Sequence, residues 1–151
     1  MFAVAQGWQL GCPLVKLLGI GSHDCLAVQA YDQGLRGRVN ILIDAQRGEF
    51  YVAPYDLTLQ GPRLLAPLRL VARAEIMESA TAGERFIGPV SHSFSGGLRI
   101  FPAAAVLGSL ALGRSNFLPG EKLEPIYLRE TAFVKAPPPR KIGRASCRER
   151  V

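Results

Sequence analysis

The sequence predicts an α/β fold, a mixed sheet with flanking helices. Segments with helical and strand-like patterns alternate along the chain. Two runs rich in β-branched and aromatic residues, 39–43 and 50–55, flank a short polar turn that contains Gly48. That arrangement is typical of a β-hairpin. The chain has 151 residues, a length that fits one domain with a real core.

The two arms of the hairpin differ in pattern. The first arm, 39–43, is almost continuously apolar, as expected of a strand covered on both faces. The second arm alternates between apolar and amphipathic residues. It contains Pro54, which has no N–H to donate to a neighbouring strand. We therefore expect the second arm to lie nearer the edge of the sheet.

Helical spacing and the positions of proline and serine indicate the elements before the hairpin. Residues 2–10 have the spacing of a helix, and Pro13 ends it. A strand is expected at 14–20. Ser22 can cap the next helix, which runs to about Asp32, because its hydroxyl would accept an N–H of the first turn.

The elements after the hairpin are shorter. An apolar stretch interrupted by prolines covers 62–71, and a short helix at 73–79 precedes a strand near 85–87. A further helix begins after Pro102. Its residues, 103–112, are apolar nearly all round, which predicts a buried helix.

Three segments of the chain carry a family resemblance. They are Phe-Ala-Val-Ala-Gln-Gly-Trp-Gln-Leu at 2–10, Asp-Ala-Gln-Arg-Gly-Glu at 44–49, and Pro-Ile-Tyr-Leu-Arg at 125–129. In residue identity and in order they resemble the TsaB family, whose members are the bacterial partner subunit in tRNA threonylcarbamoyladenosine synthesis. The resemblance covers roughly residues 1–136.

The resemblance implies an actin-like ATPase (ASKHA) fold and a non-catalytic subunit without a cofactor. The expected partners are the catalytic paralogue TsaD and the ATPase TsaE, with tRNA met only indirectly. The chain opens just after the place where the family's signature loop lies, so the resemblance predicts a truncated fold, mostly the second lobe, over 1–140. No apolar run is long enough to span a membrane, and the cysteine spacing is not that of a disulfide scaffold. A cytoplasmic location is expected.

The resemblance also implies a partner interface on the first predicted helix. Phe2, Ala5 and Gln9 lie on one face of such a helix, and Val4 and Trp8 form an adjacent pair four residues apart. The same face could instead pack on a first lobe of the protein itself, and the two interpretations stay open. An uncovered apolar face would also allow self-association.

Residues with possible chemistry have simpler structural explanations. His23 and Cys25, with Cys12, could suggest a metal or nucleophile site, but side chains at adjacent helix positions diverge. The segment 19–22, Gly-Ile-Gly-Ser, could hold a phosphate at a strand-to-helix turn, yet it lacks the third glycine of a dinucleotide site. Asp44 and Glu49 fit turn chemistry better than a catalytic pair of carboxylates.

Two alternative functions follow from these features. One is a small nucleotide-binding enzyme of the ASKHA type that uses the 19–22 turn. The other is an unrelated α/β scaffold whose hairpin matches the family by accident. Most of the arginines are scattered along the sequence, which gives direct nucleic-acid binding a weak basis.

The last residues, 141–151, have the sequence of a sequencing adapter translated in frame and are expected to be a disordered tail. Four basic residues against one acid give this tail a charge of 4 − 1 = +3, so the net charge of +6 falls to 6 − 3 = +3 for the rest.

We predict that limited proteolysis removes 142–151 without loss of the fold, because this segment was never selected to pack. Mass spectrometry would identify the cleavage, and thermal melts would compare the two forms. A lower melting temperature after removal of the tail would contradict the adapter interpretation.

Overall fold

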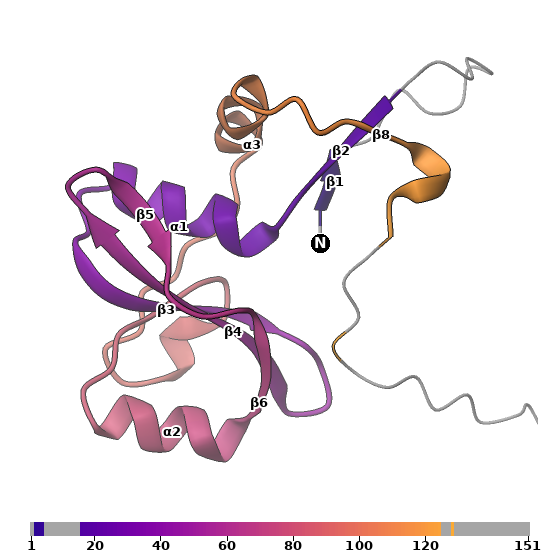
Figure 1. Ribbon diagram of the computed structural model, residues 1–151. Helices are drawn as coiled ribbons and strands as arrows, with labels where there is room; N and C mark the ends of the chain where they lie inside the picture. Colours follow the sequence, from indigo (N-terminus) through magenta and orange to yellow (C-terminus); the bar gives the residue numbers. More distant parts are fainter. Residues whose placement is uncertain (1, 5–15, 125–127, 129–151) are drawn as a thin grey trace, which may run out of the picture.

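A β-hairpin is the centre of the fold in the computed structural model, which describes residues 2–4, 16–124 and 128 (Figure 1). Its arms are β3 (Gly37–Asp44) and β4 (Glu49–Thr58). They pair antiparallel in a continuous register from Gly37 opposite Leu57 to Asp44 opposite Phe50. The predicted hairpin is confirmed, and both strands extend beyond the apolar runs that indicated them.

The hairpin turn has a left-handed backbone. Gln46, Arg47 and Gly48 have φ angles of 65°, 56° and 77°. The carboxylate of Asp44 accepts the backbone N–H of Gln46 at 2.7 Å, which is an Asx turn. Asp44 therefore has the turn role that the sequence predicted.

Three shorter strands complete the main sheet. They are β5 (Gly61–Leu64), β6 (Arg69–Ala72) and β7 (Phe86–Ile87). The strand order is β5-β4-β3-β7, and β6 also pairs with β4. Since β7 runs parallel to β3 while β5 and β6 run antiparallel to β4, the sheet is mixed, as predicted.

Two helices cover opposite faces of this sheet (Figure 1). They are α1 (Ser22–Asp32) and α2 (Arg73–Thr81), both at the predicted positions. Because side chains alternate along a strand, the neighbours Ile41 and Leu42 of β3 belong to the two different cores. The core on the α1 face comprises Leu26, Ala27, Ala30, Val39, Ile41, Ala53, Tyr55, Leu57, Ile87 and Ile100; that on the α2 face comprises Leu42, Phe50, Val52, Val71, Ile76, Ala80, Phe86 and Phe94.

A second, smaller sheet has the order β1-β2-β8. Its strands are β1 (Phe2–Val4), β2 (Lys16–Ile20) and β8 (Leu118–Pro119), and both pairings are antiparallel. The helix α3 (Ala104–Leu112) contacts α1 and β2. Two 3₁₀ turns, η1 (Ser91–Ser93) and η2 (Gly120–Lys122), complete the described elements.

The helix predicted over 2–10 is wrong at its start. Phe2–Val4 form a strand in which Phe2 lies opposite Ile20 and Val4 opposite Leu18. Intrinsic helix preference is a weak signal, and pairing with an available sheet edge overrides it. The rest of that prediction, 5–10, lies outside the described residues.

The helix predicted after Pro102 is present as α3, but the prediction that it is buried is wrong. None of its residues is buried, and Leu112 is 90% exposed. Among the described elements, α1 and β2 are the two that α3 contacts most. Apolar composition shows that a helix is suited to burial, but it does not determine what covers the helix.

The prediction that β4 lies near the sheet edge is also wrong, because β4 has neighbours on both sides. Pro54 lies where the outer neighbour changes from β6, which pairs through Val52, to β5, which begins to pair at Tyr55. The carbonyl of Pro54 accepts the N–H of Leu65 at 2.9 Å on that outer side. The missing N–H of Pro54 therefore points into the junction between two strands, where no regular ladder bond is lost.

Ser22 does not cap α1 with its side chain, contrary to prediction. The N-cap is Gly21, whose carbonyl accepts the N–H groups of Asp24 and Cys25 at 3.1 and 3.3 Å. Ser22 is thus already the first helical residue. A hydroxyl at that position is one residue too late for the N-cap role.

We expect Ile41→Ala to lower the free energy of unfolding by about 2 to 5 kcal/mol, because Ile41 is fully buried in the α1-face core. Arg47→Ala, at the exposed turn, should change stability little. Chemical denaturation would measure both variants. Equal losses would show that the hairpin is not the core of the fold.

Candidate functional site

Two glycines of the turn between β2 and α1 lie close to neighbouring side chains. A Cβ on Gly19 would lie 2.8 Å from a methyl carbon of Leu123. A Cβ on Gly21 would lie 2.8 Å from Nε2 of His23 and 3.1 Å from a carboxylate oxygen of Asp24. A side chain at either position would therefore require Leu123 or His23 to move.

A pocket of about 330 Å³ opens above this turn. Its wall includes two carboxylates, Asp44 from the hairpin and Glu124, and the imidazole of His23. Among the described residues, the lining contains no lysine or arginine, so a phosphate would meet negative charge from this part of the wall. The pocket suits a cationic or hydrogen-bond-donating group. The lining residues are Gly19, Ile20, Gly21, Ser22, His23, Ile43, Asp44, Tyr51, Leu68, Leu123 and Glu124.

Three polar side chains form a hydrogen-bonded chain behind the pocket. The hydroxyl of Tyr55 donates to a carboxylate oxygen of Asp24 at 2.8 Å. Nδ1 of His23 lies 2.8 Å from the same hydroxyl oxygen. Since the one hydroxyl proton goes to Asp24, the oxygen accepts from Nδ1–H of His23. The neutral imidazole therefore carries its proton on Nδ1 and a lone pair on Nε2.

Burial sets the protonation of this chain. Burial lowers the pKa of His23 below its ordinary value of about 6.5, although the nearby Asp24 carboxylate acts in the opposite direction. Burial, together with the hydrogen bond to Asp24, raises the pKa of Tyr55. At neutral pH both groups are uncharged, and Tyr55 stays a donor.

The same chain of contacts joins distant parts of the fold. A guanidinium nitrogen of Arg114, just after α3, lies 3.8 Å from Asp24. The thiol of Cys25 contacts the carbonyl oxygen of Ala103 at 3.6 Å, and burial raises its pKa. The start of α1 is thus tied to β4 by Tyr55 and to both ends of α3 by these two contacts.

The structure distributes the sequence-predicted candidates unevenly. His23 lines the pocket, whereas Cys25 is a buried free thiol and Cys12 lies outside the described residues. In the described ranges, no three His, Cys, Asp or Glu side chains gather as metal ligands.

The partner-interface candidates are only partly placed. Phe2 and Val4 lie on β1, paired with β2 rather than on a helix. Ala5, Trp8 and Gln9 lie outside the described residues. Their role in an interface stays a prediction.

Sequence reasoning missed Tyr55 and Arg114. Tyr55 is separated from Asp24 by 31 positions, so no local pattern links them. A usable signal exists for Tyr55: its position on β4 places it on the same face as Ala53 and Leu57, which pack under α1. No comparable signal identifies Arg114.

A scan for membrane-spanning segments finds, in the described part of the chain, no helix long and apolar enough to cross a bilayer. No family model matches the sequence, and no curated protein matches it.

Solved structures do resemble this fold. One is described as an uncharacterized protein with similarity to peptidase YeaZ from Pseudomonas aeruginosa. It has 25% identity and a TM-score of 0.60, and the match covers 76% of this chain and 59% of that one. A second is YeaZ from Pseudomonas aeruginosa, with 24% identity and a TM-score of 0.56, covering 73% of this chain and 59% of that one.

These matches define the class of fold: a mixed α/β architecture of the ASKHA type. YeaZ is another name for TsaB, so the particular likeness is to the family that the sequence motifs resembled. The predicted fold class is confirmed. The chain spans 59% of the length of each of these two structures.

We predict that His23 makes stability depend on pH. The unfolded chain takes up a proton as the pH falls through about 6.5, whereas the folded chain resists it, because the pKa of His23 is lowered. Stability should therefore decrease from about pH 6.5 downward, until the lower pKa of the folded state is passed. His23→Asn should flatten that decrease, since its amide can still donate to Tyr55 but does not titrate.

Denaturant melts at about pH 5 and about pH 7.5 would measure this difference. His92→Asn is the matched control, because His92 is exposed in the η1 turn. It should keep the pH dependence of the unmodified chain. If the stability of His23→Asn still depended on pH as strongly as that of the unmodified chain, His23 would not be the source of the pH dependence.

Proposed function

We propose that the chain is a non-catalytic partner subunit in threonylcarbamoyl transfer to the adenosine next to the tRNA anticodon. The observation that carries the proposal is the fold likeness to YeaZ-type structures over about three quarters of the chain. The three motifs at 2–10, 44–49 and 125–129 support it, because they lie in the family's order. In this proposal the chain pairs with the catalytic paralogue TsaD, and the ATPase TsaE acts in the same complex.

The polar chain has a structural role, which is compatible with a non-catalytic subunit. Tyr55 donates to Asp24 and accepts from Nδ1 of His23. Such a chain holds α1 against β4. The name of one solved relative contains the word peptidase, and that word describes the relative alone.

The alternative of a nucleotide-binding enzyme receives little support from the pocket. Asp44 and Glu124 would repel the phosphates of a nucleotide. A Gly21 substitution would also displace His23, so loss of binding in such a variant would not identify a nucleotide site. Direct titration of the unmodified chain with ATP is the sharper test.

We predict that the chain co-elutes with TsaD in size-exclusion chromatography, and that adding it to TsaD and TsaE, supplied with an activated threonylcarbamoyl donor, raises threonylcarbamoyladenosine in tRNA. Nucleoside mass spectrometry would measure the product. Trp8→Glu should weaken both effects, because it places a charge in the proposed interface.

Leu59→Glu is the matched control, since Leu59 is 86% exposed at the turn between β4 and β5. It should leave both effects unchanged. Absence of co-elution and of product with the unmodified chain would refute the proposed function. If Trp8→Glu and Leu59→Glu weakened binding and product formation equally, the 2–10 segment would not be part of the interface.

A further inference from the structure

The pocket of about 330 Å³ at the β2–α1 turn combines apolar walls with two carboxylates, and it is named the acidic pocket. Ile20 is buried in its wall, whereas Ile43, Leu68 and Leu123 are half-buried. Water therefore still touches part of the apolar surface of these three side chains. A ligand with an aliphatic body would cover that surface, which is favourable.

The two carboxylates come from separate parts of the chain. Asp44 ends β3, and Glu124 follows the η2 turn; both residues are exposed. One oxygen of Asp44 accepts the N–H of Gln46, which is an uncharged donor. In the described ranges, no nitrogen of Lys, Arg or His lies within 4.0 Å of a carboxylate oxygen of Asp44 or Glu124. The two acids give this part of the wall a charge of (−1) + (−1) = −2.

His23 adds a third acceptor to the wall. Its Nδ1–H donates to the hydroxyl of Tyr55 at 2.8 Å, so Nε2 carries a lone pair. Nε2 lies 2.8 Å from the position that a Cβ on Gly21 would take, and both residues line the pocket. The acidic pocket therefore offers acceptors to a ligand that brings N–H donors.

These acceptors are spread along the pocket rather than gathered around one point. Among the residues that the structure describes, no three His, Cys, Asp or Glu side chains lie close enough to hold a metal ion together. A compact cation would thus meet one carboxylate at a time. A chain with a positive charge at each end can reach both.

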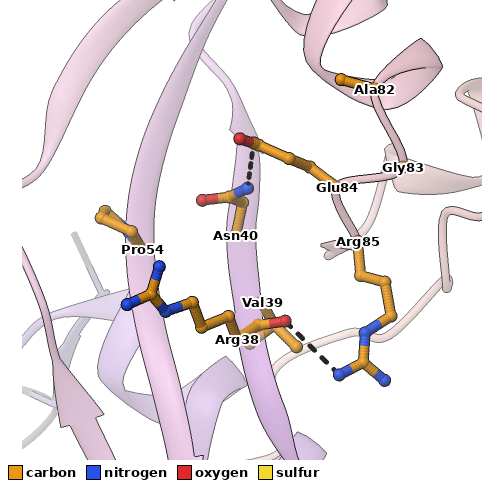
Figure 2. A pocket seen from close by; sticks show the side chains of 8 residues that line it. All are labelled: Arg38, Val39, Asn40, Pro54, Ala82, Gly83, Glu84 and Arg85. Carbon is orange, nitrogen blue, oxygen red and sulfur yellow. Dashed lines mark hydrogen bonds between the residues drawn. The ribbon is translucent and has the colours of Figure 1, made fainter.

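The pocket between β3 and the 82–85 loop, of about 400 Å³, has a different character (Figure 2). It carries charges of both signs, from Arg38, Glu84 and Arg85. Arg85 donates to the carbonyl of Arg38 at 3.4 Å, and Asn40 donates to Glu84 at 2.7 Å (Figure 2). Two of its charged groups therefore hold its own walls together. The acidic pocket, by contrast, has charge of one sign in its described lining.

We propose that the acidic pocket binds an aliphatic diamine, with one ammonium group on Asp44, the other on Glu124 and the methylene chain along the apolar wall. Each ammonium has three N–H donors, and Nε2 of His23 offers the ligand a further acceptor. The two positive charges match the two carboxylates. This site goes beyond the proposed function and does not rest on it.

Isothermal titration calorimetry of the full chain at low salt would test the proposal. The probes are linear diamines with four to eight methylene groups, each compared with the monoamine of the same length. Affinity should pass through a maximum at one length, because only there do both ammonium groups reach a carboxylate. At that length the diamine should bind about tenfold more tightly than the monoamine, as expected for one more charge-assisted hydrogen bond.

Two variants remove one carboxylate each. Asp44→Asn should make the diamine bind no better than the monoamine, and its amide oxygen can still accept from Gln46. Glu124→Gln should have the same effect. Glu78→Gln is the matched control, since Glu78 is an exposed acid on α2 and is not among the residues that line the pocket. It should keep the tenfold difference.

Four results would overturn the proposal. Affinity that rises steadily with ligand length would show apolar contact alone. A monoamine that binds as tightly as the best diamine would assign the pocket to a single charge, such as a lysine side chain of a protein partner. Equal effects of Asp44→Asn and Glu78→Gln would show binding by overall charge. The fourth is an absence of diamine binding at low salt. Co-elution with TsaD is measured separately, so either proposal can fail while the other stands.

Discussion

The register of the β3–β4 hairpin is the constraint on which the rest of the structure depends. Ile41 faces the core under α1, and Leu42, the next residue, faces the core under α2. On β4, Ala53 and Val52 lie directly opposite these two residues and divide in the same way. A shift of β3 by one residue would turn its residues to the opposite faces and place Arg38 and Asn40 under α1. The left-handed turn at 46–48 fixes the register from one end.

The same register positions two pockets on opposite faces of the main sheet. Tyr55 lies on the α1 side of β4 and there reaches His23 and Asp24 behind one pocket. Arg38 and Pro54 lie on the opposite side of the sheet and line a second pocket there. Each pocket opens where a covering helix ends, so the lengths of α1 and α2 determine which part of each sheet face stays accessible.

Local patterns predicted most of the main sheet and its helices. The hairpin, α1, α2 and β7 were all indicated by alternation, helical spacing or turn residues. These signals act over a few residues, and they survive because the cores reinforce them. Three predictions failed for one shared reason: the first helix, the burial of α3 and the edge position of β4 all depend on what lies beside an element.

For the same reason, much of the candidate site could not be predicted from the sequence. The Gly-Ile-Gly-Ser turn was recognised as unusual, but the closeness of Leu123 and His23 to its glycines is visible only in space. Arg85 is 47 positions from Arg38 in the sequence, yet its guanidinium donates to the backbone carbonyls of Arg36 and Arg38. The parallel pairing of β7 with β3 brings them together. Long-range strand pairing is the information that single-sequence patterns lack.

The junction at Pro54 has a consequence for how this fold can vary. Two separate strands share the outer edge of β4, and residues 65–68 pass from one to the other. Because each strand is anchored by its own ladder, extra residues inserted between them would bulge outward at the junction and leave both pairings in register. The proline that interrupts the ladder thus marks a place where relatives of this chain can acquire insertions of different length while the two cores stay the same.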